Sequence, residues 1–352
     1  MSVARNLIGI GVIGCGHWGP NHIRVFSQIE RSQVIACADL NPGRRAHVES
    51  LYPMVRCESD YRRILDDDAI DAVVVATPTP SHAHIARDVL EVGKHVLVEK
   101  PLCTTSAEAR ALGSLAEARR LVLMVGHVFL FNDGIMKLHE LITDGTLGKV
   151  RYLDAVRTNL GPIRPDVNAL YDLGTHDISI FNYLTGAQPV SVSAVGSCIT
   201  QPEIEDVCFV TLRYGDGVLG HVHVSWLNPR KVRTLTVVAD AKMAHWDDVD
   251  PMDTVRVYDK GLDAPPSYDS FGQFQCLLRS AGVSVPNIRR VEPLVNQAEA
   301  FLDSVENLAP CRSGGTEAAN VLAVVEAAIA SMADGGRMCP VDCESHVPVS
   351  AH

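Results

Sequence analysis

The segment GVIGCGHWGPNHI, residues 11–23, decides the fold of the first part of this chain. It contains Gly14-x-Gly16-x-x-Gly19 between an apolar run typical of a buried strand and an amphipathic stretch typical of a helix. Such a turn presents backbone N–H groups and a helix N-terminus to an anion, so the segment predicts the pyrophosphate site of a dinucleotide.

Asp39 extends this prediction. It ends the next apolar run, twenty residues after Gly19, where a carboxylate would accept hydrogen bonds from ribose hydroxyls and repel a 2′-phosphate. We therefore expect NAD as the cofactor, with NADP as the less favoured alternative because Arg44 and Arg45 follow closely. The residues expected to contact the cofactor in this part are Gly14, Cys15, Gly16, His17, Trp18, Gly19 and Asp39.

The alternation of elements predicts the fold class. From residue 7 to about 126, short apolar runs alternate with longer amphipathic segments, which indicates an α/β domain with a doubly wound parallel sheet of the Rossmann type. After Gly126 the rhythm changes, and runs of alternating polar and apolar residues follow, with 232–248 interpreted as a single strand. These predict an α+β domain with a large, open, mostly antiparallel sheet.

Two domains follow from this pattern. We expect an NAD-binding Rossmann domain over residues 1–126 and a substrate-binding and oligomerisation domain over 127–352. Helices predicted at about 292–336 are expected to pack back on the first domain. The open face of the second sheet would expose apolar area in a monomer, so we expect a homodimer or homotetramer built on it.

Composition excludes several function classes. The first domain has equal numbers of basic and acidic residues, so the net charge of -11 falls on the second domain. This negative charge argues against a nucleic-acid partner. The apolar runs are judged too short for a membrane span, and no signal-peptide pattern is present, so we expect a cytoplasmic protein with no membrane partner. The ten cysteines match no zinc spacing, and His221 and His223 lack a third ligand, so no metal is expected.

Several candidate site residues follow predicted strands. Ligands of doubly wound sheets bind outside the carboxyl ends of the strands, so these residues would face the cofactor crevice and its nicotinamide half. The turn ATPTPSH (76–82) and the strand end VEKPL (98–102) supply most of them, and a histidine ends a later strand. The candidates are Thr77, Pro78, Thr79, His82, Glu99, Lys100 and His127.

A polar stripe marks the predicted helix ALYDLGTHDISIFNYLTG, residues 169–186. Asp172 and His176 are four residues apart and share one helix face, while most other positions are apolar. Such a stripe is either a solvated face or the wall of a site.

Together, the glycine-rich turn, VEKPL and YDLGTHD make this sequence resemble the Gfo/Idh/MocA oxidoreductase family over nearly the whole chain. The resemblance implies that Lys100, Asp172 and His176 line an active site. His176 would be the general base, and Lys100 would bond the substrate oxygen and stabilise the developing alkoxide. Asp172 would hold the imidazole or bond a sugar hydroxyl.

The stretch RPDVNALYDLGTHD departs from the glycine run that many family members carry before this helix. It is more similar to the branch that acts on sugars and nucleotide sugars. Loops and helix starts often carry recognition residues, so Arg164, Asn168 and Tyr171, with His127, are candidates for substrate binding.

We therefore expect an NAD-dependent oxidoreductase that interconverts a secondary ring hydroxyl and a ketone on a pyranose. The acidic second domain favours an amino sugar of the aminoglycoside type, within antibiotic or polysaccharide biosynthesis, whose ketone is then available for transamination. A UDP- or dTDP-sugar 3-dehydrogenase comes second, with NPRKVR (228–233) and IRR (288–290) supplying cations for the diphosphate. An inositol or cyclitol dehydrogenase comes third. A dinucleotide-binding regulator without turnover would belong to a different class of protein.

Overall fold

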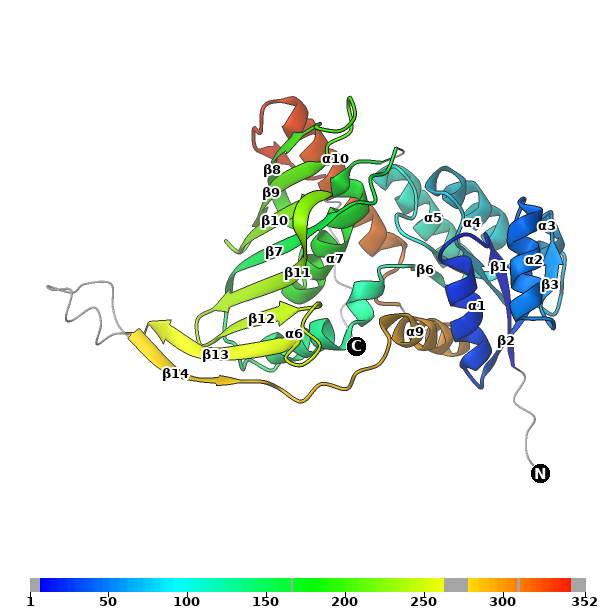
Figure 1. The fold of residues 1–352 in the computed structure, drawn as a ribbon, viewed down its shortest axis with the longest axis horizontal. Helices are drawn as coiled ribbons and strands as arrows, with labels where there is room; N and C mark the ends of the chain where they lie inside the picture. The colour runs from blue at the N-terminus through cyan, green and yellow to red at the C-terminus, as the bar shows by residue number, and fades with distance from the viewer. Residues whose placement is uncertain (1–6, 166, 263–277, 309–310, 343–352) are drawn as a thin grey trace, which may run out of the picture. The chain divides into compact units, whose positions relative to one another are not determined.

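The chain folds into two compact units in the computed structural model (Figure 1). The first comprises residues 1–132 and 291–322, and the second comprises 133–290 and 323–352. The residues that the structure describes are 7–165, 167–262, 278–308 and 311–342.

The first unit is built on a parallel sheet. Within its described residues this sheet has six strands in the order β3-β2-β1-β4-β5-β6. The strand order reverses between β1 and β4, which is the switch point where doubly wound sheets bind dinucleotides. Both of these strands are buried along their whole length, which explains their continuous apolar sequence. The strands are β1 (Ile8–Ile13), β2 (Ser32–Ala38), β3 (Arg56–Glu58), β4 (Ala72–Val75), β5 (His95–Val98) and β6 (Leu123–Val125).

Helices follow the strands of this sheet. α1 begins at Gly19, directly after the glycine-rich turn, and carries Pro20 in its first turn, where a missing N–H costs nothing. Asn41 caps α2 by accepting hydrogen bonds from the N–H groups of Gly43 and Arg44. The helices of this unit are α1 (Gly19–Gln28), α2 (Pro42–Leu51), α3 (Arg62–Leu65), α4 (His82–Glu91), α5 (Ser106–Arg119) and α9 (Pro293–Asn307), with 3₁₀ turns η1 (Thr79–Ser81) and η2 (Val128–Phe131).

The second unit is built on a mixed sheet. Its described residues form nine strands in the order β14-β13-β12-β11-β7-β10-β9-β8-β15, and β10 pairs with β7 in parallel while the other neighbours pair antiparallel. The strands are β7 (Val150–Leu160), β8 (Pro189–Ser197), β9 (Val207–Tyr214), β10 (Leu219–Ser225), β11 (Leu227–Ala239), β12 (Met243–Asp247), β13 (Val255–Leu262), β14 (Leu278–Ser284) and β15 (Cys339–Pro340).

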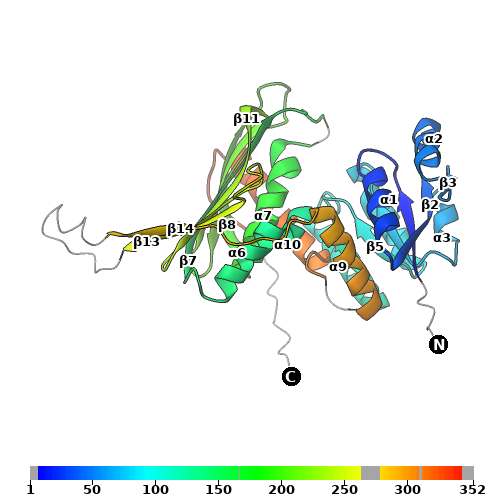
Figure 2. The same cartoon turned by 60° about the horizontal axis from the view of Figure 1, so that its bottom comes forward.

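One face of this sheet is covered by helices. Figure 2 shows α6 (Asp133–Thr143) and α7 (Thr175–Thr185) on the same side of the sheet. Alternate residues of β9 and β10 are buried beneath this side, while those between them are exposed on the other side. The second sheet therefore has one covered face and one open face, as the alternating pattern predicts.

Two details differ from the sequence-based expectations. The segment 232–248 is not one strand, because the chain turns at Asp240–Lys242 and β12 pairs back on β11, with Met243 opposite Val238. The short polar turn between two apolar runs allows this reversal.

The helix α10 (Gly315–Ala333) is the second difference. It is long and apolar enough, by length and composition alone, to span a membrane, although the sequence was judged to lack such a run. Half of its apolar 18-residue stretch is buried inside the protein, and core helices of soluble proteins can be equally long and apolar.

Candidate active site

The three glycines of the turn after β1 each meet a different requirement. Gly14 has a φ of 96°, and a Cβ there would lie 2.5 Å from the carbonyl oxygen of Ala76. A Cβ on Gly19 would lie 2.0 Å from the Gly14 carbonyl oxygen, so this glycine lets α1 pack against the turn. A Cβ on Gly16 would meet only the Arg44 guanidinium, at 3.9 Å, which leaves the backbone open to a pyrophosphate. The turn thus fits a dinucleotide.

Asp39 is fixed beside this turn. Its carboxylate accepts hydrogen bonds from the backbone N–H of Cys15 and of Asn41, each at 2.8 Å. Arg44 lies 3.6 Å from the same carboxylate, whereas Arg45 donates to the backbone carbonyls of residues 39 and 40. His17 and Trp18 are exposed, and their contact with the cofactor stays a prediction.

The turn after β4 is tied to the end of β5 through His82. Its Nδ1 lies 2.8 Å from the Pro101 carbonyl oxygen, and its Nε2 lies 2.7 Å from that of Thr77. Thr79 and His82 are buried and Pro78 is exposed. Both ring nitrogens of His82 therefore serve to hold the two strand ends, which gives this histidine a positioning role.

Glu99 and His127 surround the strand end that carries Lys100. His22, on the buried side of α1, lies 2.9 Å from Glu99 through its Nε2. A Cβ on Gly126 would lie 3.1 Å from the Glu99 carboxylate, so this glycine makes room for it. Burial, and then the charge of Lys100, lower the pKa of His127 to about 4, so this histidine is neutral near pH 7.

In the second unit, Asp172 and His176 lie where a π-helical turn, η3 (Leu170–Gly174), runs into α7. A Cβ on Gly174 would lie 2.5 Å from the Leu170 side chain, which explains the glycine between them. His176 is buried and Asp172 is half-buried. The sequence predicted a helix but not the π turn, and such turns are frequent at functional sites.

The Asp172 carboxylate is held by two side chains from other elements. Trp226, at the junction of β10 and β11, donates its indole N–H at 3.2 Å, and Arg164 donates to the other oxygen at 3.2 Å. Trp226 is fully buried, so its N–H needs such an acceptor. Trp226 was not predicted as a site residue, although a tryptophan ending a buried strand is a signal for a buried polar partner.

A buried ion pair fixes α7 to the sheet. Arg157 on β7 donates two hydrogen bonds to Asp177, at 2.9 and 2.8 Å, and both side chains are almost completely buried. Removing one partner of such a pair would leave an uncompensated buried charge. The helix that carries His176 is thereby held in one position on β7.

The loop before η3 is ordered by Asn168. Its amide oxygen accepts from the N–H of Tyr171, and its amide nitrogen donates to Glu205 at 2.8 Å. Gln201 donates to the carbonyl oxygen of Arg164. Asn168 thus acts as a cap for the turn, while Tyr171 is half-buried beside Asp172 in the chain.

No cluster of potential metal ligands occurs among the residues that the structure describes. His221 lies 2.8 Å from Asp154, and His223 stacks on Phe209 with ring centroids 4.4 Å apart. The described cysteines are free thiols, and Cys276 and Cys343 lie outside the described residues.

The first unit has the strand order, the complete glycine fingerprint and the acidic strand end of a dinucleotide-binding enzyme. The second unit by itself holds an aspartate fixed one turn before a buried histidine. These features are the ones expected of an NAD-dependent dehydrogenase.

Two family descriptions match the chain. "Oxidoreductase family, NAD-binding Rossmann fold" covers residues 8–127, and "GFO/IDH/MocA C-terminal domain" covers residues 135–245. The chain therefore belongs to the Gfo/Idh/MocA oxidoreductase family, and it binds NAD through its first unit.

Three similar proteins are informative. UDP-N-acetylglucosamine 3-dehydrogenase of Acidithiobacillus ferrooxidans is 30% identical over 89% of this chain and 93% of that enzyme. Inositol 2-dehydrogenase 2 of Saccharopolyspora erythraea is 33% identical, over 62% of this chain and 66% of that enzyme. The crystal structure of GenD2 from gentamicin A biosynthesis, in complex with NAD, is 26% identical with a TM-score of 0.80, covering 96% of this chain and 97% of that one.

Proposed function

We propose that this protein oxidises a secondary ring hydroxyl of an amino-bearing pyranose to a ketone. The observation that carries the proposal is the Asp172 carboxylate, held by Trp226 and Arg164 one turn before the buried His176. The similarities to UDP-N-acetylglucosamine 3-dehydrogenase and to GenD2 from gentamicin A biosynthesis support it.

When bound, NAD would supply the acceptor for the hydride of the carbinol carbon. Gly14, Gly16 and Asp39 would hold this cofactor. In this proposal the imidazole of His176 takes the hydroxyl proton, and it returns the proton when the ketone is reduced. The Lys100 ammonium bonds the same oxygen and stabilises the negative charge that develops on it. Asp172 bonds a neighbouring hydroxyl of the sugar.

Carboxylates near η3 favour a substrate with an ammonium group. Asp172 and Glu205 both lie beside the loop that holds Arg164 and Asn168, and the net charge of the chain is -11. A cationic amino sugar would gain from these charges, and the gain would fall with added salt. The ketone formed would suit a later transamination in antibiotic or polysaccharide biosynthesis.

A nucleotide sugar is the second candidate. Arg230 and Lys231 are exposed in the part of β11 where the pairing with β7 shifts between Leu227 and Val232, just after Trp226. Two cations there could contact a diphosphate. The 30% identity to UDP-N-acetylglucosamine 3-dehydrogenase over 89% of the chain also favours this substrate class.

The substrate test is NADH formation from NAD⁺ at mildly alkaline pH. The panel contains aminoglycosides and free amino sugars, UDP- and dTDP-sugars, and inositols. Turnover of the cationic set, weakened by salt, supports the first candidate, whereas turnover confined to nucleotide sugars or inositols overturns it. NAD binding without turnover of any compound would indicate the non-catalytic regulator.

The mechanism is tested with His176→Gln and Lys100→Met, using His84→Gln and Lys149→Met at exposed positions as matched controls. We expect kcat/KM to fall by about 10²–10⁴ in each site variant, the usual range for an acid–base group, with an unchanged Kd for NAD. Trp226→Phe keeps an aromatic ring but removes the N–H that Asp172 accepts, so kcat/KM should fall by about tenfold. Unchanged turnover in the first two variants would refute these roles.

A further inference from the structure

Three cysteines come together beneath the cofactor turn. The sulfurs of Cys37 and Cys57 are 3.2 Å apart, and these two residues are direct register partners on the parallel strands β2 and β3. The Cys15 thiol donates to the Ala38 carbonyl oxygen at 3.8 Å, and the neighbouring Cys37 thiol lowers its pKa. The sulfur of Cys37 therefore contacts Cys57 directly, and Cys15 lies nearby.

The position of this cluster links it to NAD binding. Cys15 lies between Gly14 and Gly16, and its backbone N–H donates to Asp39. Cys37 precedes Asp39 by two residues on β2. A change at the sulfur of Cys37 therefore reaches both the glycine-rich turn and the acidic strand end.

The geometry allows a disulfide between Cys37 and Cys57. Neighbouring strands lie about 4.8 Å apart, which is inside the range of about 4.4–6.8 Å between the Cα atoms of bonded cysteines. Cys57 is half-buried and open to a small oxidant, whereas Cys37 is fully buried behind it. Burial raises the pKa of Cys57 and also that of the more deeply buried Cys208 and Cys311, to about 12 in the last two. Neither of these two lies within hydrogen-bond distance of a second thiol among the residues that the structure describes.

We propose that Cys37 and Cys57 form a reversible disulfide under peroxide and that this modification weakens NAD binding. The Cys57 thiolate attacks hydrogen peroxide, the O–O bond breaks, and a sulfenic acid and hydroxide result. The Cys37 sulfur then attacks the sulfenic sulfur, loses its proton and displaces a second hydroxide. Overall, two thiols lose two electrons and two protons, peroxide becomes two water molecules, and a dithiol reductant reverses the change.

The disulfide acts on the cofactor turn in two ways. The Cys37 sulfur loses its proton, so this thiol can no longer lower the pKa of Cys15 in the turn. Forming the S–S bond also brings the two sulfurs from 3.2 Å to about 2.05 Å, and the side-chain adjustment falls two residues before Asp39. Both changes disturb the backbone that receives the pyrophosphate and the ribose.

The test uses the full chain, treated with hydrogen peroxide at pH 8 and then freed of peroxide. We expect the titratable thiols to fall by two, mass mapping without reductant to find Cys37 joined to Cys57, and the Kd for NAD to rise about tenfold, as for one lost hydrogen bond. Dithiothreitol should restore the original Kd. Because burial raises the pKa of Cys57, oxidation should be faster at higher pH.

Cys57→Ser is the decisive variant, because the half-buried position of Cys57 tolerates a serine. Cys37→Ser is less suitable, because it would place a hydroxyl group in a fully buried site. Cys57→Ser should bind NAD as the reduced wild type does and lose the response to peroxide, while the exposed control Cys198→Ser keeps the response. A different disulfide, an unchanged Kd in the oxidised wild type, or a response that persists in Cys57→Ser would overturn the proposal. The readout is NAD binding, so the result does not depend on which sugar is the substrate.

Discussion

At the scale of single residues, the site side chains are held by partners far away in the chain. His22 holds Glu99 from α1, and Trp226 holds Asp172 from the junction of two strands. The spacing in the sequence identifies Glu99 and Asp172 as candidates, and each of these contacts fixes the orientation of the side chain. The energetic reason is that a buried polar group costs free energy unless it is hydrogen-bonded, so each buried donor or acceptor selects a partner.

His127 makes a pH-dependent contribution to stability. Its pKa is about 4 in the folded protein, chiefly through burial, against about 6.5 in an unfolded chain. The folded state therefore favours the neutral imidazole. This contribution is fully present above pH 6.5 and is lost as the pH falls towards 4, by about 3 kcal/mol in total.

The measurement is urea unfolding of the wild type and His127→Gln between pH 4 and 7. The free energy of unfolding of the variant should fall less steeply with acid than that of the wild type, because glutamine takes up no proton. Parallel curves for the two proteins would contradict the assignment.

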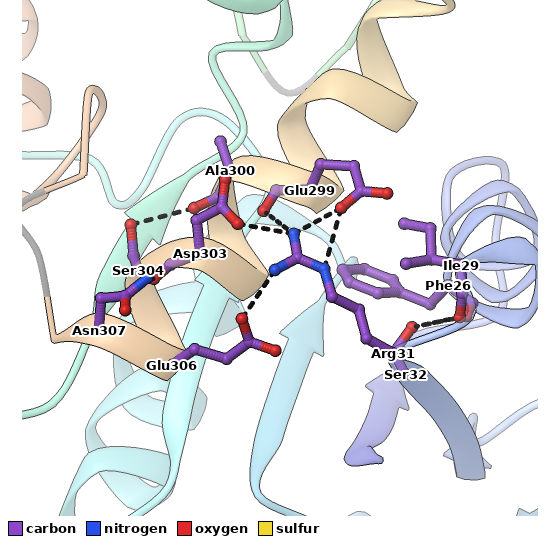
Figure 3. A network of polar contacts seen from close by, with 10 residues as sticks. All are labelled: Phe26, Ile29, Arg31, Ser32, Glu299, Ala300, Asp303, Ser304, Glu306 and Asn307. Atoms are coloured by element: carbon purple, nitrogen blue, oxygen red, sulfur yellow. Dashed lines mark hydrogen bonds and ion pairs between the residues drawn. The ribbon is translucent and has the colours of Figure 1, made fainter. Parts of the chain in front are cut away.

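At the scale of elements, ion pairs between Arg31 and three carboxylates hold α9 against the rest of the first unit. Arg31, between α1 and β2, lies 2.5 Å from Glu299, 2.7 Å from Asp303 and 2.8 Å from Glu306, which share one face of α9 (Figure 3). The rings of Phe26 on α1 and Phe301 on α9 pack beside it, with centroids 6.3 Å apart. A helix from the later part of the chain thereby completes the Rossmann unit.

Replacing Arg31 with alanine should destabilise this unit. Three carboxylates of one helix face would then lie close together without their cation, and the guanidinium's hydrogen bond to the backbone carbonyl of Glu299 would be lost. Because these groups are partly exposed, we expect a loss of about 1–2 kcal/mol, smaller at high salt.

Urea unfolding at low and high salt measures this loss. Arg24→Ala, which breaks only the pair with Glu292, is the matched control and should cost less. Equal effects of the two substitutions, or no dependence on salt, would argue against a carboxylate cluster that needs Arg31.

At the scale of the whole molecule, the open face of the nine-stranded sheet carries large apolar side chains. Val195 and Phe209 are neighbours across β8 and β9, and Tyr152 and Leu219 are neighbours across β7 and β10. All four are between 42% and 49% exposed, and they alternate along their strands with buried residues such as Leu153 and Val210, so they lie on the open face. We propose that a second copy of the chain covers this face, because such a patch is costly to leave in water.

Phe209→Arg tests this proposal by placing a charge in the centre of the patch. We expect light scattering after size-exclusion chromatography to show a dimer or tetramer for the wild type and a monomer for the variant. Met54→Arg, at an exposed position on the first unit, should leave the assembly unchanged. A monomeric wild type at micromolar concentration would refute the proposal.

The sequence alone determined the fold class, the cofactor and the family, because these depend on local spacing. The glycines of the turn, Asp39 twenty residues on, and the positions of Lys100, Asp172 and His176 are all properties of short segments. Backbone geometry makes such spacings informative, since a turn or a helix face is set within a few residues.

Only the tertiary structure decided what surrounds those residues. The indole of Trp226 on Asp172, the burial that lowers the pKa of His127, the return of the chain from β11 into β12, and the contact of Cys37 with Cys57 join segments distant in sequence. The orientation, protonation and reactivity of a side chain depend on its neighbours and on the exclusion of water. Both of these conditions are set by tertiary packing.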